Sequence, residues 1–371
     1  MYLTKFTLRQ VKSFADVTLD FQQPDGSIRL WNVIIGENGT GKTTLLQAMA
    51  MALAGEKAAS VLLPRPRGWV RIGALSGEIE ATITRGTKRK ARVKLEIVEE
   101  GDEGPAIVSE SRNTRNGSSG FAAGYGPFRR LSGGSEQAGK LAKMKTKEAR
   151  FVTLFREDAA LIQCEQWLKD LDYARLDDSD PDNQRRATRL LQAVRETIND
   201  YLLPEGVRLE SINPRGVYFR TPVAKRIALS DLSDGYRAML ALGIDLIRHL
   251  SYVYSDLIMQ NPEWLRDATG VVLIDELDTH LHPTWQREIS FWLKSCFPSL
   301  QFIVATHSPF IPQAADKGGL YILRRPENSD IVQVFVDEPY VRGWRVDQIL
   351  AILFDTPSLY DTDSLPDSRK R

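Results

Sequence analysis

The chain has 371 residues, of which 42% are apolar and 26% charged, so it is long enough for one large domain or two ordinary ones. Its formal net charge of +1 excludes a polycation, so a nucleic acid would have to bind a local basic patch. The two cysteines, Cys164 and Cys296, stand far apart and exclude a disulfide framework or a cysteine-rich zinc site. No signal-peptide core and no membrane-spanning apolar run occurs, which predicts a cytoplasmic protein without a membrane partner.

Alternating apolar and polar residues predict β-strands from residue 1 to residue 35, and the last of them ends in a continuous apolar run. A glycine-rich loop follows directly. Four apolar residues then recur at helical spacing and predict an amphipathic helix that Gly55 ends: Leu45, Leu46, Met49 and Leu53.

Strand patterns return at 69–98, on either side of a basic hairpin loop. Helical spacing dominates 140–202, and a further long helix covers about 235–250. Two more buried-strand runs follow, at 271–274 and 302–305. We therefore predict an α/β fold whose core consists of 1–100 and 205–371 and is interrupted by a mostly helical insertion at 101–204.

A phosphate-binding loop is the clearest motif. Residues Gly36, Glu37, Asn38, Gly39, Thr40, Gly41, Lys42 and Thr43 match the pattern G-x-x-x-x-G-K-[ST] in full, between a predicted strand and a predicted helix. Glycines let backbone amides surround phosphate oxygens, and the helix N-terminus adds partial positive charge. Lys42 should reach the β- and γ-phosphates, the Thr43 hydroxyl should bind Mg²⁺, and Thr44 belongs to the same set. The loop predicts ATP and Mg²⁺ as cofactors.

Two carboxylates supply the second half of such a site. Asp275 and Glu276 directly follow the apolar run 271–274, at the carboxyl end of a predicted central strand. Ligands of open α/β sheets bind at that end. Asp275 would contact Mg²⁺, and Glu276 would polarise the attacking water.

The residues after this pair carry a family resemblance. Leu277-Asp278-Thr279-His280-Leu281-His282-Pro283, together with Thr306-His307-Ser308-Pro309 and the opening strand, resembles ABC-type ATPases of the RecF, SMC and OLD group. The resemblance covers about 1–55 and 205–350. It implies an ABC-type P-loop ATPase head with a mixed-sheet core, with His307 as the switch histidine that contacts the γ-phosphate. It also places Lys12 and Ser13 in the region that contacts the base or ribose.

Such ATPases need a signature motif, and the chain offers two candidates. The segment 131–135 has the better spelling, but it lies far before Asp275 and precedes lysine-rich sequence. The segment 232–236 opens a long predicted helix, whose N-terminus can face phosphate. We therefore expect Ser233 and Gly235 to be the signature residues. Asp234 departs from the usual glycine and sets an acidic group near phosphate.

The resemblance also implies partners. A signature of this kind contacts ATP bound to another protomer, which predicts a homodimer with ATP sandwiched between the heads. Three segments look like ATPases of bacterial anti-phage defence, including the Septu and retron-associated ones, which pair with an effector, commonly a nuclease: 154–158, 167–171 and 343–350. A RecF- or SMC-like repair head that binds DNA is the main alternative. A transporter ATPase is less favoured, as is an OLD-type enzyme, because too little sequence follows His307 for its nuclease module.

Several basic residues and histidines could either bind a ligand or simply lie on the solvent-exposed surface. Basic patches at 85–94 and 140–150 would contact DNA or RNA, or would simply form a solvated face. His280 and His282 have the spacing of a metal pair but lack a third ligand of the usual kind. We expect His249 to be a helix-surface residue.

Overall fold

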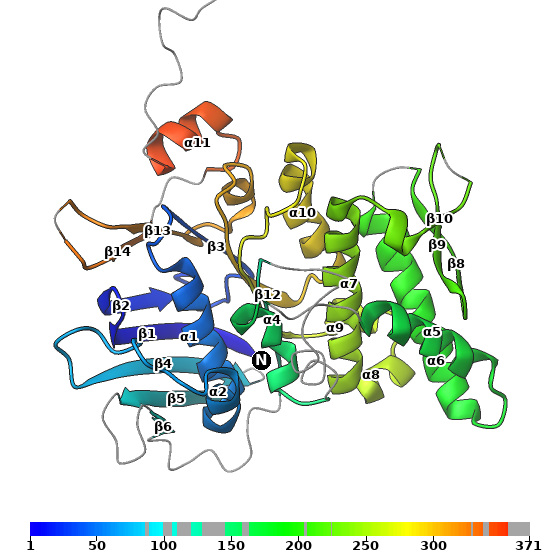
Figure 1. The fold of residues 1–371 in the computed structure, drawn as a ribbon, viewed down its shortest axis with the longest axis horizontal. Helices are drawn as coiled ribbons and strands as arrows, with labels where there is room; N and C mark the ends of the chain where they lie inside the picture. The colour runs from blue at the N-terminus through cyan, green and yellow to red at the C-terminus, as the bar shows by residue number, and fades with distance from the viewer. Residues whose placement is uncertain are drawn as a thin grey trace, which may run out of the picture.

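The computed structural model describes residues 1–85, 89–98, 106–109, 120–127, 145–157, 163–203, 206–223, 225–327, 329–336 and 341–354. Two large sheets occupy one half of the molecule, and helices with a small third sheet form the other (Figure 1). The alternative signature candidate at 131–135 lies outside the described residues.

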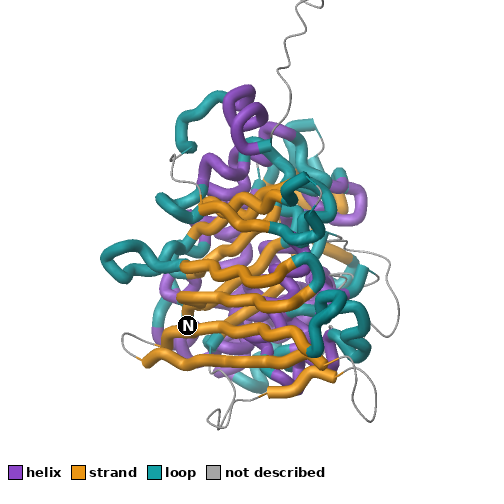
Figure 2. The backbone as a smooth tube through the Cα atoms, turned by 90° about the vertical axis from the view of Figure 1, so that its left-hand side faces the viewer, coloured by secondary structure: helices purple, strands orange, loops and turns teal. Residues whose placement is uncertain are grey.

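The N-terminal sheet is antiparallel and has the strand order β2-β1-β4-β5-β6. Its strands lie one above another along one side of the molecule (Figure 2). Four of its strands confirm those predicted at the N-terminus and at 69–98: β1 (Tyr2–Val11), β2 (Phe14–Asp20), β4 (Ser76–Arg85) and β5 (Arg89–Val98). The fifth strand, β6 (Ala106–Ser109), lies in the segment predicted to be a mostly helical insertion.

The central sheet has the order β14-β13-β3-β12-β11-β7, and all of its pairs are parallel except β13 with β14. It is therefore mixed, which confirms the predicted core. Its strands are β3 (Trp31–Gly36), β7 (Phe121–Tyr125), β11 (Gly270–Ile274), β12 (Leu300–Ala305), β13 (Leu320–Arg324) and β14 (Gln333–Val336).

Helix α1 (Lys42–Ala54) lies between the two large sheets, and α2 (Glu56–Leu62) follows it. The predicted amphipathic character of α1 is wrong. Its side chains are buried on every side except at Thr43, which is exposed, and Gln47, which is half-buried. A helix covered by a sheet on two sides needs an apolar surface all round. Gly55, with φ 90°, ends α1 as predicted.

Helices cover the other face of the central sheet. Alternate strand residues divide between two cores, so that Val272 faces α7 and Val271 faces α1. The covering elements are α7 (Asp234–Val253), α8 (Ser255–Gln260), α9 (Trp264–Asp267), α10 (Pro283–Cys296) and η4 (Ile311–Ala314). Helix α11 (Val346–Leu353) lies beyond β13 and β14.

A helical lobe packs beside α7 (Figure 1). Its elements are α5 (Gln163–Leu176), α6 (Pro181–Thr197), η2 (Ile198–Leu202), β8 (Arg208–Asn213), β9 (Gly216–Arg220), β10 (Ile227–Ala228) and η3 (Leu229–Asp231). The short elements η1 (Glu148–Arg150) and α4 (Val152–Phe155) instead pack against β7 and belong to the core around α1. The segment 101–204 is thus not separate from the core, because β6 and β7 belong to the two large sheets. Among the described residues of this segment, the helices follow β7.

Candidate active site

The phosphate loop connects β3 to α1, as its sequence predicts. Gly41 has φ 91°, a left-handed conformation, and a β-carbon there would come within 2.7 Å of the Phe14 ring. Gly36 is equally confined, since a β-carbon would come within 2.6 Å of the Leu323 carbonyl oxygen. Both positions therefore require glycine, and the loop can curl tightly above the helix N-terminus.

Lys42 is the first residue of α1 and is 6% exposed. Its Nζ donates hydrogen bonds to the carbonyl oxygens of Gly36, at 2.8 Å, and Glu37, at 2.9 Å. Burial lowers the pKa of the Lys42 ammonium, and the negative charges of Asp275 and Glu276 partly offset this effect. The ammonium thus lies inside the phosphate loop, where the backbone of the loop would surround a bound phosphate group.

Thr43 and Asp275 meet although 232 positions separate them in the sequence. The Thr43 hydroxyl donates a hydrogen bond of 2.6 Å to Asp275 Oδ2, and Asp275 itself is 1% exposed at the end of β11. A hydroxyl and a carboxylate oxygen are the hard ligands that Mg²⁺ prefers. The donor set fits the predicted metal, with Thr43 and Asp275 as its protein ligands.

Glu276 begins the turn that leaves β11. It has φ 45°, a left-handed conformation that is unusual for a residue other than glycine. Its Oε2 accepts a hydrogen bond of 2.9 Å from the Thr279 hydroxyl, and the side chain is half-buried. The Thr279 hydroxyl thus orients the Glu276 carboxylate within the turn.

Asp278 was not singled out from the sequence, yet it joins two strand ends. Its Oδ1 accepts a hydrogen bond of 2.5 Å from the Thr306 hydroxyl and one of 3.3 Å from the His307 backbone N–H. The loop after β11 and the loop after β12 are therefore held together. Burial, and secondly the charge of Lys42, lower the pKa of His307, so its imidazole is neutral at pH 7.

Lys12 and Ser13 lie beside the phosphate loop, as the resemblance implies. Lys12 has φ 47°, and its Nζ lies 3.5 Å from the Thr44 hydroxyl and 4.4 Å from the centroid of the Trp69 ring. The Ser13 hydroxyl would lie 3.4 Å from a β-carbon at Gly41. Trp69 was not predicted, because only the antiparallel sheet brings it to Lys12. Arg325 was not predicted either; it follows β13, whose pairing with β3 lets its Nη2 donate a hydrogen bond of 2.8 Å to the Gly39 carbonyl.

Ser233 caps the N-terminus of α7 and is exposed. A β-carbon at Gly235 would come within 3.0 Å of the His280 carbonyl oxygen, so the signature helix packs closely on the loop after Asp275. Asp234 forms an ion pair with Arg237 one turn along the helix. Within the described residues, no hydrogen bond joins Ser233 to the phosphate loop of the same chain.

The histidine pair after Asp278 has a structural role. His280 is exposed with φ 67°, while His282 Nδ1 accepts a hydrogen bond of 3.4 Å from the Thr284 N–H at the start of α10. Nowhere in the described part of the chain do three or more His, Cys, Asp or Glu side chains gather to hold a metal.

Some of the cations in the basic patch 85–94 already form ion pairs within the chain, which the sequence alone does not show. Arg92 forms an ion pair of 2.5 Å with Glu80, and Lys94 forms one of 3.2 Å with Glu78, because β4 pairs with β5. In the second patch, Arg150 lies over the Phe121 ring, and Lys145 lies over the Tyr252 ring. Lys88, Lys140 and Lys143 lie outside the described residues.

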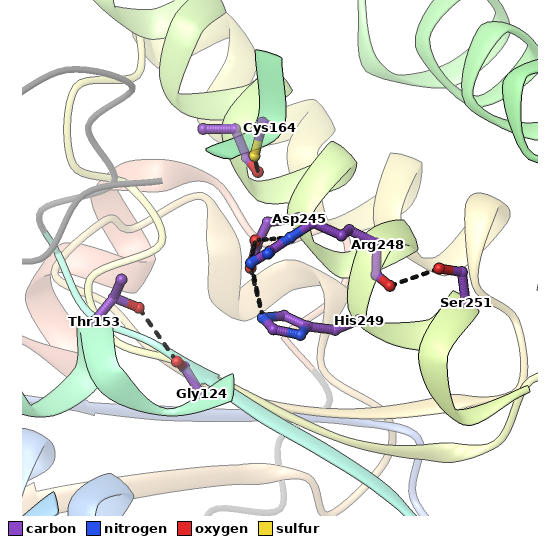
Figure 3. A network of polar contacts seen from close by, with 8 residues as sticks. Gly124, Thr153, Cys164, Asp245, Arg248, His249 and Ser251 are labelled. Atoms are coloured by element: carbon purple, nitrogen blue, oxygen red, sulfur yellow. Dashed lines mark hydrogen bonds and ion pairs between the residues drawn. The ribbon is translucent and has the colours of Figure 1, made fainter. Parts of the chain in front are cut away.

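The prediction for His249 is wrong, because its side chain is buried in α7 beside Asp245 and Arg248 (Figure 3). Arg248 donates hydrogen bonds of 3.0 and 2.6 Å to Asp245 Oδ1, and His249 Nε2 lies 3.4 Å from Asp245 Oδ2. Burial lowers the pKa of His249 to about 4. Helical spacing alone could not show which face of α7 is covered.

Comparisons with known proteins agree with this geometry. The family described as "AAA domain, putative AbiEii toxin, Type IV TA system" matches residues 31–311. Septu protein PtuA of Bacillus mycoides is 28% identical over 99% of this chain and 46% of its own length. Retron Ec83 probable ATPase of Escherichia coli is 36% identical over 35% of this chain and 22% of its own. The chain thus spans less than half the length of these relatives.

Solved structures share the fold. An SMC head bound to the C-terminal winged-helix domain of ScpA has a TM-score of 0.58 at 17% identity, covering 91% of this chain and 98% of its own. An SMC head with an extended coiled coil has a TM-score of 0.54, also at 17% identity, over 91% of this chain and 96% of its own. Among the described residues, no helix is both long and apolar enough to cross a membrane. The chain belongs to the AAA-domain family that matches residues 31–311, and it shares the fold of the SMC heads.

Proposed function

We propose that the chain binds ATP with Mg²⁺ and hydrolyses it to ADP and phosphate. The observation that carries this proposal is the 2.6 Å hydrogen bond between Thr43 and Asp275, which unites the phosphate loop with the acidic strand end. Lys42 neutralises charge on the β- and γ-phosphates, while Thr43 and Asp275 hold Mg²⁺. That ion supplies further positive charge to the phosphates when it is bound.

Glu276 and His307 would act on the γ-phosphate side. Glu276 accepts a proton from the attacking water, which its turn conformation and the Thr279 hydroxyl keep in reach. His307 is neutral at pH 7, so one ring nitrogen donates a hydrogen bond to a phosphate oxygen. Asp278 fixes the His307 backbone relative to the Glu276 turn.

We further propose that ATP brings two heads together. Ser233 is exposed at the N-terminus of a long helix, where backbone N–H groups favour an anion. In the described part of the chain, Ser233 has no hydrogen bond to its own phosphate loop. We therefore infer that it contacts the ATP that a second protomer binds. Each of the two ATP molecules would then lie between the phosphate loop of one chain and Ser233 and Gly235 of the other.

Three variants test both steps. Lys42→Ala removes the buried cation and should abolish ATP binding. Glu276→Gln should bind ATP, slow turnover by about 100-fold or more, and accumulate as a dimer. Ser233→Arg should bind ATP as a monomer. Turnover, nucleotide affinity and light-scattering mass check these outcomes. Wild-type turnover in Glu276→Gln would remove that residue from its role, and a Glu276→Gln protein that stays monomeric with ATP would contradict the dimer.

The similarity to Septu and retron ATPases supports a biological role. We propose that the ATP-bound dimer controls a partner effector, such as a nuclease, in anti-phage defence. A RecF-like repair ATPase acting on DNA is the alternative. Co-purification with neighbouring gene products, with and without ATP, separates the two. A nuclease that binds wild-type protein but responds differently to Glu276→Gln supports control, whereas phage protection by the chain alone would contradict the need for a partner.

A further inference from the structure

The small sheet formed by β8, β9 and β10 concentrates positive charge. Residues 206–228 contain five Lys or Arg and one Asp or Glu, whereas the whole chain has a net charge of +1. The sheet lies at the outer edge of the helical lobe, apart from the two larger sheets (Figure 1). One of its faces packs into the core through Leu209, Val217 and Phe219. The opposite face carries the charge.

Strand pairing sets like charges opposite one another on this face. Arg208 of β8 pairs with Arg220 of β9, and Ile227 of β10 pairs with Phe219. One residue further in the same register, Arg226 comes beside Arg220, so three arginines cross the sheet in a row. Like charges directly opposite destabilise a sheet. A bound polyanion would remove that repulsion.

An aromatic ring lies within the row of arginines. Tyr218 is two residues from Arg220 and therefore shares its face. The Arg226 guanidinium lies over the half-buried Tyr218 ring, 3.9 Å from its centroid. Aromatic rings and guanidinium planes are the surfaces on which proteins stack unpaired nucleobases.

Acidic neighbours compensate only part of this charge. Glu210 lies 2.9 Å from Arg220, and Asp200 lies 3.9 Å from Arg208; both arginine side chains are about two-thirds exposed. Arg215, Lys225 and Arg226 are exposed and form no ion pair with any residue that the structure describes. Exposed ion pairs contribute little stability, so phosphate oxygens can replace these carboxylates.

We propose that this arginine face, made of Arg208, Tyr218, Arg220 and Arg226 with Arg215 and Lys225 in the flanking turns, binds a single-stranded nucleic acid. The cations hold phosphates, and bases stack on Tyr218 and Arg226. A duplex offers the phosphates but keeps its bases stacked within itself. Because β10 ends five residues before Ser233, the ligand would lie close along the chain to the signature helix.

Fluorescence anisotropy of the full chain with a labelled single strand, over a series of salt concentrations, tests the proposal. The triple variant Arg215→Glu, Lys225→Glu and Arg226→Glu should weaken binding by about 100-fold and reduce the salt slope by about two. The matched control carries Lys57→Glu, Arg185→Glu and Lys317→Glu, exposed cations elsewhere with the same charge change, and should stay within about twofold of wild type.

Tyr218 provides the second test. Tyr218→Ala should weaken single-strand binding by about tenfold, and Tyr218→Phe should not, because the ring remains. Circular dichroism shows whether the triple variant folds. If it does not, the single variant Arg226→Gln replaces it and should likewise weaken single-strand binding. Equal loss in the two charge-reversal variants would overturn the site. Equal affinity for a duplex of the same length, unchanged by Tyr218→Ala, would overturn the single-strand assignment.

Discussion

At the scale of residues, a buried group of charged side chains on α7 determines the protonation state of one histidine. Asp245, Arg248 and His249 form a buried cluster on α7 (Figure 3). Arg248 Nη2 lies 3.2 Å from His249 Nε2, which accepts a hydrogen bond when the imidazole is neutral. Burial, and then the charge of Arg248, lower the pKa of His249, and Asp245 only partly opposes them. The histidine is therefore buried in its uncharged form.

This pairing predicts acid sensitivity of folding. The pKa of His249 is about 4 in the folded chain, against an ordinary value of 6.5, so the unfolded chain binds more protons between these pH values. Stability is then fully present above about pH 6.5 and falls as the pH drops toward 4, by up to about 1.4 kcal/mol per pH unit. His249→Gln should remove this slope, measured by denaturant unfolding from pH 7 to pH 4.5.

The exposed His280 supplies the matched control. His280→Asn, which changes an exposed histidine outside this cluster, should leave the pH slope unchanged. A wild-type free energy of unfolding that does not vary between pH 6.5 and pH 4.5 would contradict the assignment.

At the scale of elements, the signature helix and the loop after Asp275 form one unit. Tyr236 of α7 and Trp285 of α10 make an edge-to-face contact with ring centroids 4.4 Å apart. Gly235 packs on the His280 carbonyl directly beside them. Ser233 would contact the ATP of one site, and this loop belongs to the other. In the proposed dimer, the aromatic pair would therefore fix the spacing of two half-sites that serve different nucleotides.

Removing one ring should separate binding from turnover. Trp285→Ala should slow hydrolysis by about tenfold or more, because small displacements of catalytic groups are costly. ATP affinity of the monomer should change little, since the described contacts of Trp285 are with Tyr236 and Gly235 of α7. Trp285→Phe retains a ring and should rescue most turnover. Phe291→Ala, an exposed change on the same helix, is the control. Equal loss of turnover in both alanine variants would contradict the coupling.

At the scale of the whole molecule, Gln301 joins the two large sheets. This fully buried side chain on β12 accepts a hydrogen bond of 2.8 Å from the Leu3 N–H and donates one of 2.9 Å to the Leu3 carbonyl. Leu3 belongs to β1 of the antiparallel sheet. One amide thus satisfies two backbone groups at the junction, where α1 and the phosphate loop are held.

Gln301→Leu should lower the free energy of unfolding by about 2–4 kcal/mol, because two buried backbone groups lose their partners. Denaturant titration measures the change. The control is Gln166→Leu, which loses only an exposed contact to Asp170 and should change stability by less than about 0.5 kcal/mol. A Gln301→Leu protein as stable as wild type would contradict the junction.

Local sequence was sufficient to predict functional groups that lie next to one another in the chain. A phosphate loop needs glycines, a lysine and a hydroxyl in one short segment, so spacing alone predicted Gly36 to Thr43. Strand ends rich in carboxylates predicted Asp275 and Glu276 for the same reason. The resemblance added His307, Lys12 and Ser233, which no local pattern specifies. That Ser233 meets phosphate held by a partner chain stays a proposal, as do the nucleotide contacts of Lys12 and His307.

Contacts between segments that are distant in the sequence could not be predicted from local sequence patterns. Asp278 meets Thr306, Trp69 meets Lys12, and Arg92 meets Glu80 only after the strands have paired. Burial of His249 and of all sides of α1 likewise depends on which elements cover them. Sequence periodicity reports local geometry, whereas exposure and electrostatic environment are properties of the packed molecule. The sequence by itself therefore determined the phosphate-loop motif and the α/β fold, and only the tertiary structure decided which charged side chains are buried or paired.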